Sequence, residues 1–369
     1  MEKQTQVWII IGVLIVLILL GLYSFVGITG NVVSDQSGTI KIGFMGPLTG
    51  DAASYGESIK RGVDLALKDS GLRNIKIIYE DSKCEPKEAV SAVNKLISVD
   101  NVIAIVGEVC SGATLAAAPI AEEKKIVMIS ASSTSPAITK AGEYIFRTVP
   151  SDALQGDFGA NLVYNKGYRK LAILYSNEEY GVGFEKVLRE SFEKLGGQVV
   201  ASEKFERGAS DVSSQVTKIK ESGADAIYII SNSPDSAVAA LKKIKEQGIN
   251  AALIGSEGLK SDDIIKGAGS AAEGLILTSV SSGTSSFREN HKRVYGTEPG
   301  PFAAQAYDAF KALSLTLKEG AKTGAAVKNE LYDVKFKGAS GSIEFDSDGE
   351  VSGNYEVYVV RNGKFELVE

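Results

Sequence analysis

Several hydroxyl side chains follow one short apolar run in this sequence. The run KKIVMI leads into ISASSTSPAIT at residues 129–139, so Ser132, Ser133 and Thr134 come just after a predicted strand. Ser111 stands directly after Cys110 and before a predicted helix. Hydroxyls and backbone N–H groups at the start of a helix favour an anion such as a carboxylate. We therefore take these residues as candidates for binding a carboxylate.

An acidic residue and two tyrosines occupy similar positions. Glu257, in the segment GSEGL after another apolar run, could accept hydrogen bonds from an ammonium group, and Tyr55 and Tyr180 would form walls beside it. Each residue also has an ordinary interpretation. Ser and Thr after strands are common helix N-caps, Glu257 could be a solvated loop carboxylate, and the tyrosines could belong to the core or the surface. The binding interpretation depends on all of them following strands.

Composition argues against several other kinds of chemistry. The chain has one histidine, His291, in the charged segment RENHKRVYG, where we expect a surface residue. A single histidine argues against multi-histidine metal sites and hydrolytic triads, and we find no nucleotide-binding or metal-ligand motif. The net charge of −6 and the lack of a dense basic cluster make a nucleic-acid partner improbable. We expect no enzyme activity, no metal and no cofactor.

Predicted strands and helices alternate along the chain and would position these residues. Apolar runs at 39–44, 75–81, 102–108 and 125–130 predict buried strands, and stretches with helical spacing lie between them, at 55–70, 86–99 and 112–123. The cycle restarts at Leu171 with LAILYSN and continues to about residue 280. Continuously apolar strands separated by helices predict parallel sheets covered on both faces. We therefore expect an α/β protein with two doubly wound parallel-sheet lobes that divide near residues 149–154, and ligands bind such sheets at the carboxyl ends of the strands.

The first 38 residues have a different character. Residues 7–27, VWIIIGVLIVLILLGLYSFVG, carry no charge and are long enough to cross a bilayer. Lys3 precedes this segment and Asp35 is the first charge after it, which predicts a cytosolic stretch at 1–6, a transmembrane signal-anchor at 7–27 and an external stalk at 28–38. The alternative is a cleaved signal peptide, although its usual cleavage-site pattern is missing.

The chain from about Ile40 to Glu369 resembles the branched-chain amino-acid-binding proteins of ABC transporters, which have the type I periplasmic-binding fold. The segments that carry the likeness are IGFMGPLTGDAASYGESIKRGVDLAL, DSKCEPKEAVSAVNKLI, GEVCSGAT, MISASSTSPAIT, RTVPSD and NEEYGVGFEKVLRE. The resemblance implies a ligand held between two lobes that close by a hinge.

The resemblance also implies roles for individual residues. Ser111 and the segment Ser133–Thr134 would bind the carboxylate of an amino acid and part of its ammonium group, and Glu257 would be the acidic partner of the ammonium group. Tyr55, Tyr180 and Phe302 would line the cleft. The sequence departs from the family pattern at Asn232, where leucine-type binders carry an aromatic residue, and this puts a purely aliphatic ligand preference in doubt.

The two cysteines, Cys84 and Cys110, match a disulfide of that family. Both follow predicted strands, the second and the third, which we expect to be neighbours in the sheet, and an oxidising compartment outside the cell would favour the bond. The path of the chain predicts a first lobe of 39–151 and 281–353 and a second lobe of 152–280 and 354–369. Three crossings between the lobes would then form the hinge.

These observations predict the extracytoplasmic substrate-binding component of an ABC importer, tethered to the cell membrane by its N-terminal helix. It would capture a neutral amino acid, with a branched-chain one as the first candidate and a small polar amino acid or amide as the second, and deliver it to the permease. A ligand-sensing receptor ectodomain of the same fold is the alternative function. Only about six residues precede the predicted span, too few for an output domain.

Overall fold

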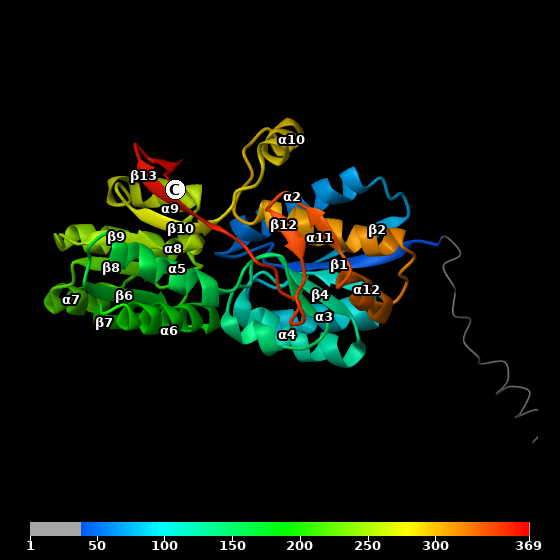
Figure 1. The fold of residues 1–369 in the computed structure, drawn as a ribbon, viewed down its shortest axis with the longest axis horizontal. Helices are drawn as coiled ribbons and strands as arrows, with labels where there is room; N and C mark the ends of the chain where they lie inside the picture. The colour runs from blue at the N-terminus through cyan, green and yellow to red at the C-terminus, as the bar shows by residue number, and fades with distance from the viewer. Residues whose placement is uncertain (1–37, 369) are drawn as a thin grey trace, which may run out of the picture. The chain divides into compact units, whose positions relative to one another are not determined.

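A computed structural model describes residues 38–368 of the chain (Figure 1). The predicted cytosolic residues 1–6, the predicted transmembrane segment 7–27 and the predicted stalk up to residue 37 lie outside the described residues. Within the described part, no helix is both long and apolar enough to cross a membrane. The described residues from Ile40 onward form one compact unit, and its two main sheets are described in turn below.

The first sheet has five parallel strands in the order β2-β1-β3-β4-β5. They are β1 (Ile40–Gly46), β2 (Ile75–Asp81), β3 (Ala104–Val106), β4 (Val127–Ser130) and β5 (Ile145–Arg147). Its helical elements are α2 (Ala53–Ser70), α3 (Pro86–Ser98), α4 (Ser111–Lys124), η1 (Pro136–Lys140), α11 (Ala303–Lys318) and α12 (Gly324–Leu331). Because β1 pairs with both β2 and β3, the expectation that the second and third strands are neighbours is wrong.

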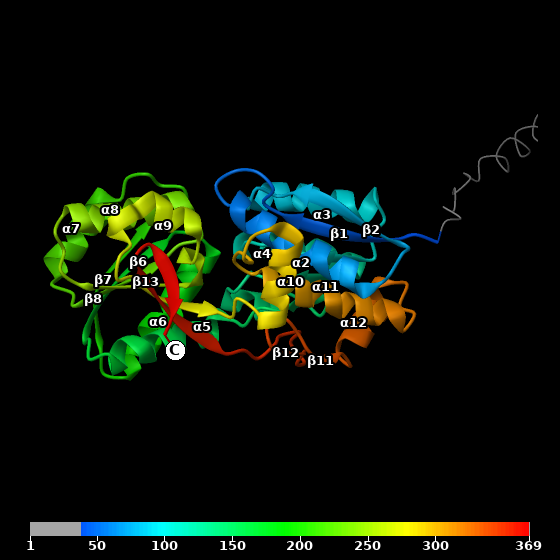
Figure 2. The same cartoon turned by 90° about the horizontal axis from the view of Figure 1, so that it is seen from above.

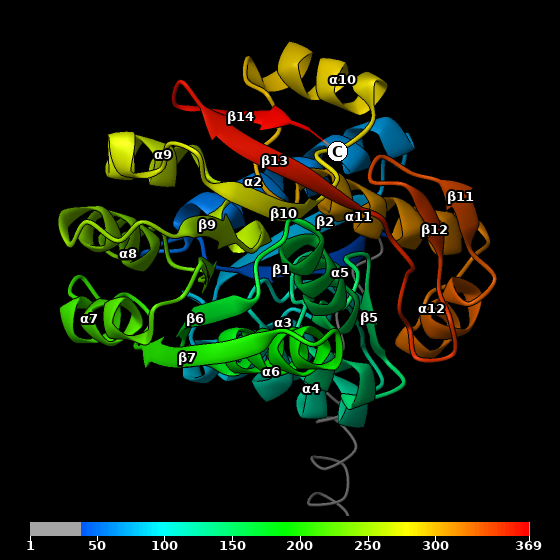
Figure 3. The same ribbon diagram turned by 60° about the vertical axis from the view of Figure 1, so that its left-hand side comes forward.

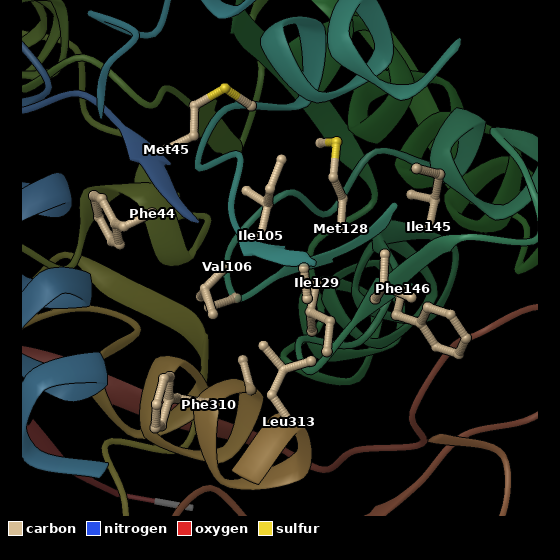
Figure 4. Packing of buried hydrophobic residues seen from close by; sticks show 14 of the residues in the cluster. Phe44, Met45, Ile105, Val106, Met128, Ile129, Ile145, Phe146, Phe310 and Leu313 are labelled. Atoms are coloured by element: carbon tan, nitrogen blue, oxygen red, sulfur yellow. The ribbon is translucent and has the colours of Figure 1, made fainter. Parts of the chain in front are cut away.

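Helices cover both faces of this sheet, as continuously apolar strands require. Helices α3 and α4 lie on one face, and α2, α11 and α12 lie on the other (Figures 1 and 2). Figure 4 shows Phe310 and Leu313 of α11 beside Val106 and Ile129 of the sheet, and all four side chains are fully buried. The C-terminal helices therefore complete the core that the N-terminal strands begin.

The second sheet has seven strands in the order β14-β13-β10-β9-β8-β6-β7. They are β6 (Lys170–Ser176), β7 (Gln198–Phe205), β8 (Ala226–Ile230), β9 (Ala252–Gly255), β10 (Ile276–Val280), β13 (Tyr355–Arg361) and β14 (Lys364–Leu367). Its helical elements are α5 (Asp152–Asn165), α6 (Glu179–Lys194), α7 (Ser213–Ser222), α8 (Pro234–Glu246), η2 (Glu257–Leu259), α9 (Asp262–Ala268) and η3 (Gly269–Ala271). Helices α7, α8 and α9 lie on one side of this sheet and α5 and α6 on the other (Figure 2). Neighbouring residues of one strand face the two sides, because Ile227 packs in one cluster with residues of α7, α8 and α9, whereas Tyr228 packs with residues of α5 and α6.

The last two strands of this sheet are antiparallel, unlike the strands before them. Strand β13 runs antiparallel to β10 and forms a hairpin with β14 (Figure 3). The hairpin turns at Asn362 and Gly363, whose φ angles of 51° and 67° suit the tight two-residue turn that Asn-Gly favours. A two-residue loop can join antiparallel strands, whereas a parallel pair needs a crossover connection.

The chain passes between the two sheets three times, after β5, after β10 and after the small hairpin β11 (Lys335–Lys337) and β12 (Ser342–Glu344). Helix α10 (Ser285–Tyr295) follows the second passage. The passages are tied together, because the Tyr355 hydroxyl donates a 3.0 Å hydrogen bond to the Ser151 carbonyl. The division into two lobes that move about these passages stays a prediction.

Candidate functional site

A small cavity lies where the carboxyl ends of strands from the two sheets meet. The centre of a water molecule can occupy a volume of about 30 Å³ inside it. Its walls are formed by Tyr55, Val109, Cys110, Ser111, Ser132, Tyr180, Asn232, Glu257, Gly258 and Phe302. The structure thus brings together seven of the nine ligand-binding residues suggested by the sequence, leaving out Ser133 and Thr134.

One wall of the cavity is the N-terminus of α4. Cys110 is the N-cap residue and Ser111 the first residue of this helix, so the first backbone N–H groups have no partner within the helix. The Ser111 hydroxyl accepts a 3.2 Å hydrogen bond from the Ser135 backbone, which leaves its own proton free to donate. Ser132 donates a 2.8 Å hydrogen bond to the Val109 carbonyl. A negatively charged group is favoured at this wall.

Ser133 and Thr134 lie behind this wall. The Ser133 hydroxyl donates to the Glu108 carbonyl at 3.0 Å and lies 2.7 Å from the Thr114 hydroxyl. The Thr134 hydroxyl is buried beside Asp152, and none of the described residues meets it in good hydrogen-bonding geometry. Arg147, almost fully buried, donates to the carbonyls of Ser133 and Ser135 at 3.3 and 2.9 Å. The side chain of Ser133 therefore holds the loop in place, and its predicted contact with a ligand has no support from this geometry.

The opposite wall carries Glu257, which is only 2% exposed. The Gln155 side-chain amide donates a 2.6 Å hydrogen bond to its carboxylate. Burial raises the pKa of Glu257 to about 7, because water no longer stabilises the charge. No ion pair to Glu257 is formed within the described residues, so the site favours a cationic partner at this point.

A second buried acid stands close to Glu257 and was not identified from the sequence. Asp152, the first residue of α5, is fully buried, and within residues 38–368 no group lies in good hydrogen-bonding geometry to either of its carboxylate oxygens, although the Thr134 hydroxyl is near enough to lower its pKa. Burial, and after it the charge of Glu257, raises the pKa of Asp152 well above its usual range. An acidic side chain in the first turn of a helix usually stabilises that helix through its dipole. The segment RTVPSD therefore did not indicate that Asp152 lies beside the binding site.

Aromatic side chains close the cavity from both sides. Tyr55 of α2 donates a 2.6 Å hydrogen bond to the carbonyl of Gly258 in η2, which links the first sheet's helices to the second sheet. Tyr180 donates to the Ser256 hydroxyl at 2.7 Å. A Cβ atom at Gly258 would lie 2.2 Å from the Ser231 carbonyl oxygen, so only glycine fits there. Phe302 precedes α11 and completes the wall.

The predicted disulfide between Cys84 and Cys110 is confirmed, with 5.4 Å between the Cα atoms. It passes the end of β1, which lies between the strands that precede the two cysteines. Because Cys110 is the N-cap of α4, the bond fixes the helix start that faces the cavity. Nearby, Glu108 accepts a 2.5 Å hydrogen bond from the Cys110 backbone, and burial raises the pKa of Glu108 to about 7.

A wider groove of about 910 Å³ adjoins the cavity and shares Glu257 and Phe302 with it. His291 of α10 lines this groove, and the expectation that it is a surface residue is wrong, because only 1% of it is exposed. The rings of Phe287 and Tyr295, four positions away on either side, lie 6.0 and 4.8 Å from the His291 ring and cover it.

Across residues 38–368, no cluster of three or more acidic, cysteine or histidine side chains could hold a metal.

Two α/β sheets that present a helix N-terminus and a buried carboxylate to one small cavity define a solute-binding protein with the type I periplasmic-binding fold. Residues 39–364 match the family described as periplasmic binding protein. The chain therefore belongs to this family, whose members bind substrates for transporters and are not enzymes.

Individual relatives and solved structures agree with this assignment. The leucine-, isoleucine-, valine-, threonine- and alanine-binding protein of Pseudomonas aeruginosa is 29% identical over 340 residues, which cover 87% of this chain and 89% of that protein. The structure of a leucine-binding protein, LivK, from Thermotoga maritima matches with a TM-score of 0.84 and 28% identity, over 90% of this chain and 98% of that one. LivJ from Streptococcus pneumoniae, solved with isoleucine, matches with a TM-score of 0.82 and 30% identity, over 89% and 99% of the two chains.

Proposed function

We propose that this protein is the extracytoplasmic substrate-binding component of an ABC importer and that it captures a neutral α-amino acid in the cavity between its two sheets. The observation that carries the proposal is the pair of opposite walls, a helix N-terminus at Ser111 and a buried carboxylate at Glu257. An α-amino acid has a carboxylate and an ammonium group close together, which matches this pair. The walls beside them, Tyr55, Tyr180 and Phe302, carry no charge and favour an uncharged side chain.

The relatives named for leucine, isoleucine and valine make a branched-chain amino acid the first candidate, and Asn232 makes a small polar amino acid or amide the second. A thermal-shift screen of the full chain, kept in solution with a mild detergent, tests both. A ligand at about 100 times its dissociation constant stabilises a protein by about 2.7 kcal/mol. The proposal fails if no amino acid raises the melting temperature, whatever other small molecules do.

We propose that the ligand binds first to the wall at Ser111 and that closure of the two lobes, 39–151 with 281–353 and 152–280 with 354–369, then brings Glu257 to the ammonium group. Contacts that exist only in the closed state shift the equilibrium towards it. Two interactions join the proposed lobes in this structure and would break if the lobes moved apart: the hydrogen bond from Tyr55 to Gly258 and the ion pair between Arg207 and Glu85 at 3.2 Å. Small-angle scattering should show contraction when ligand is added, and an unchanged profile at saturation would argue for a rigid site.

We also propose that residues 7–27 anchor the protein in the cell membrane with the binding domain outside, where it would deliver its ligand to the permease. The support is the uncharged length of this segment and the charges on either side of it. Protease added to intact cells should release the binding domain. A mature N-terminus near Gly30 would instead indicate a cleaved signal peptide.

A further inference from the structure

The side chain of Asn232 lines the cavity, and its carbonyl oxygen has no hydrogen-bond partner among residues 38–368. It follows β8, and its Oδ1 atom is buried. Its neighbours are fixed among themselves: the Ser231 hydroxyl donates to the Ser233 carbonyl at 3.1 Å and accepts from the Ser233 backbone at 3.2 Å. The loop is therefore held by its two serines, and the Asn232 amide is left for another partner.

The other polar side chains on the cavity wall already have partners. Tyr55 and Tyr180 donate to Gly258 and Ser256, as described above. Ser132 donates to Val109, and Glu257 accepts from the Gln155 amide. The main-chain groups of a bound amino acid are assigned to Ser111 and Glu257 in the proposed function. Among the described residues of the wall, Asn232 is thus the polar side chain that remains for the ligand's own side chain.

We infer that Asn232 determines specificity by pairing with a hydroxyl or amide on the ligand's side chain, so that threonine binds more tightly than valine and the second candidate named above, a small polar amino acid, takes precedence over the first. This inference rests on the proposed function and adds the side-chain class to it. A buried polar group left unpaired is unfavourable, and a site built to hydrogen-bond a hydroxyl rejects the analogue that lacks it. A hydroxyl both donates and accepts, so it satisfies either end of the amide.

Threonine and valine form a matched pair for the test, because they have nearly the same shape and differ in a hydroxyl against a methyl group. Calorimetry on the full chain in detergent should give a dissociation constant for valine at least about 10-fold above that for threonine. In Asn232→Leu, where the amide is replaced by an apolar side chain of similar size, the ratio should fall to about one or reverse. Asn94→Leu, at an exposed position of α3, serves as the control and should keep the wild-type ratio.

A wild-type protein that binds valine as tightly as threonine would overturn the inference and leave the proposed function standing. A threonine preference that survives in Asn232→Leu would also overturn it. If neither these two nor any other amino acid binds, the proposed function fails and this inference fails with it. Should Asn232→Leu not fold, as judged by circular dichroism, the wild-type ratio decides.

Discussion

Replacing Glu257 by glutamine should stabilise the ligand-free protein and weaken ligand binding at the same time. Burial raises the pKa of this carboxyl from its usual 4.5 to about 7. That difference corresponds to about 3 kcal/mol of unfavourable free energy for the ionised side chain in the folded, ligand-free protein at pH 8. Glutamine keeps the side chain's shape and an oxygen for the Gln155 amide while removing the charge. It also removes the repulsion that the Glu257 charge exerts on Asp152.

The direction of the pH effect on stability follows from the number of protons that the folded and unfolded states bind. Between pH 4.5 and 7 the folded protein holds a proton on Glu257 that the unfolded chain has lost, so the free energy of unfolding falls as the pH rises through this window. We expect Glu257→Gln to lack this decline and to be more stable than the wild type by up to about 3 kcal/mol at pH 8. Ligand affinity should instead increase as the pH rises, because the ammonium group of the ligand pairs with the ionised form of the Glu257 carboxylate. Wild-type affinity for an amino acid should fall about tenfold for each pH unit below 7.

Urea unfolding and calorimetry at pH 5.5 and pH 8 measure both effects. We expect Glu257→Gln to lose about 3–5 kcal/mol of binding free energy at pH 8, because the bound ammonium group is left buried and unpaired. Glu221→Gln, at an exposed position of α7, is the matched control and should change neither quantity. A Glu257→Gln protein that is less stable than the wild type at pH 8 and still binds as tightly would refute this reasoning.

Three further variants, two single and one double, each test one contact. Ser111→Ala should weaken binding by about 1.5–3 kcal/mol in calorimetry, the usual range for a hydrogen bond to a charged group; an unchanged affinity would exclude Ser111 as a carboxylate ligand. Tyr55→Phe removes the bond to Gly258 and should weaken binding by about 0.5–1.5 kcal/mol while reducing the contraction seen by scattering. An unaffected contraction would mean that this bond does not support closure. Replacing Cys84 and Cys110 together by serine should lower the free energy of unfolding by about 3.5 kcal/mol for a separation of 26 residues, and an equally stable double variant would contradict this.

The sequence predicted the parts of the fold that depend on local pattern. The helix expected at 86–99 is α3, Pro86–Ser98, and the strand expected at 75–81 is β2 with the same bounds. Both follow from the alternation of apolar runs with helical spacing, which requires buried parallel strands. The expected strand at 102–108 is shorter in the structure, where β3 spans Ala104–Val106, because the chain leaves the sheet to build the cavity wall at Val109.

Features that depend on which distant segments meet in the fold were not predicted from the sequence. The position of β1 between β2 and β3 is a matter of sheet order, which apolar runs do not encode. His291 is a local case: the Phe287 and Tyr295 rings that cover it lie four positions away on its own helix, and this spacing is present in the sequence beside the charges that suggested exposure. Asp152 became part of the site only because α5 begins beside Glu257, which the pattern around it does not indicate.

The most direct test compares the tightest-binding amino acid with the 2-hydroxy acid of the same side chain, by calorimetric titration of the full chain at pH 8. The two ligands share the carboxylate and the side chain and differ only in the ammonium group that Glu257 is proposed to hold. We expect the hydroxy acid to bind at least about 100-fold more weakly, which corresponds to about 2.7 kcal/mol. Equal affinity for the two would contradict the central claim, because the site would then recognise a carboxylate without an ammonium group.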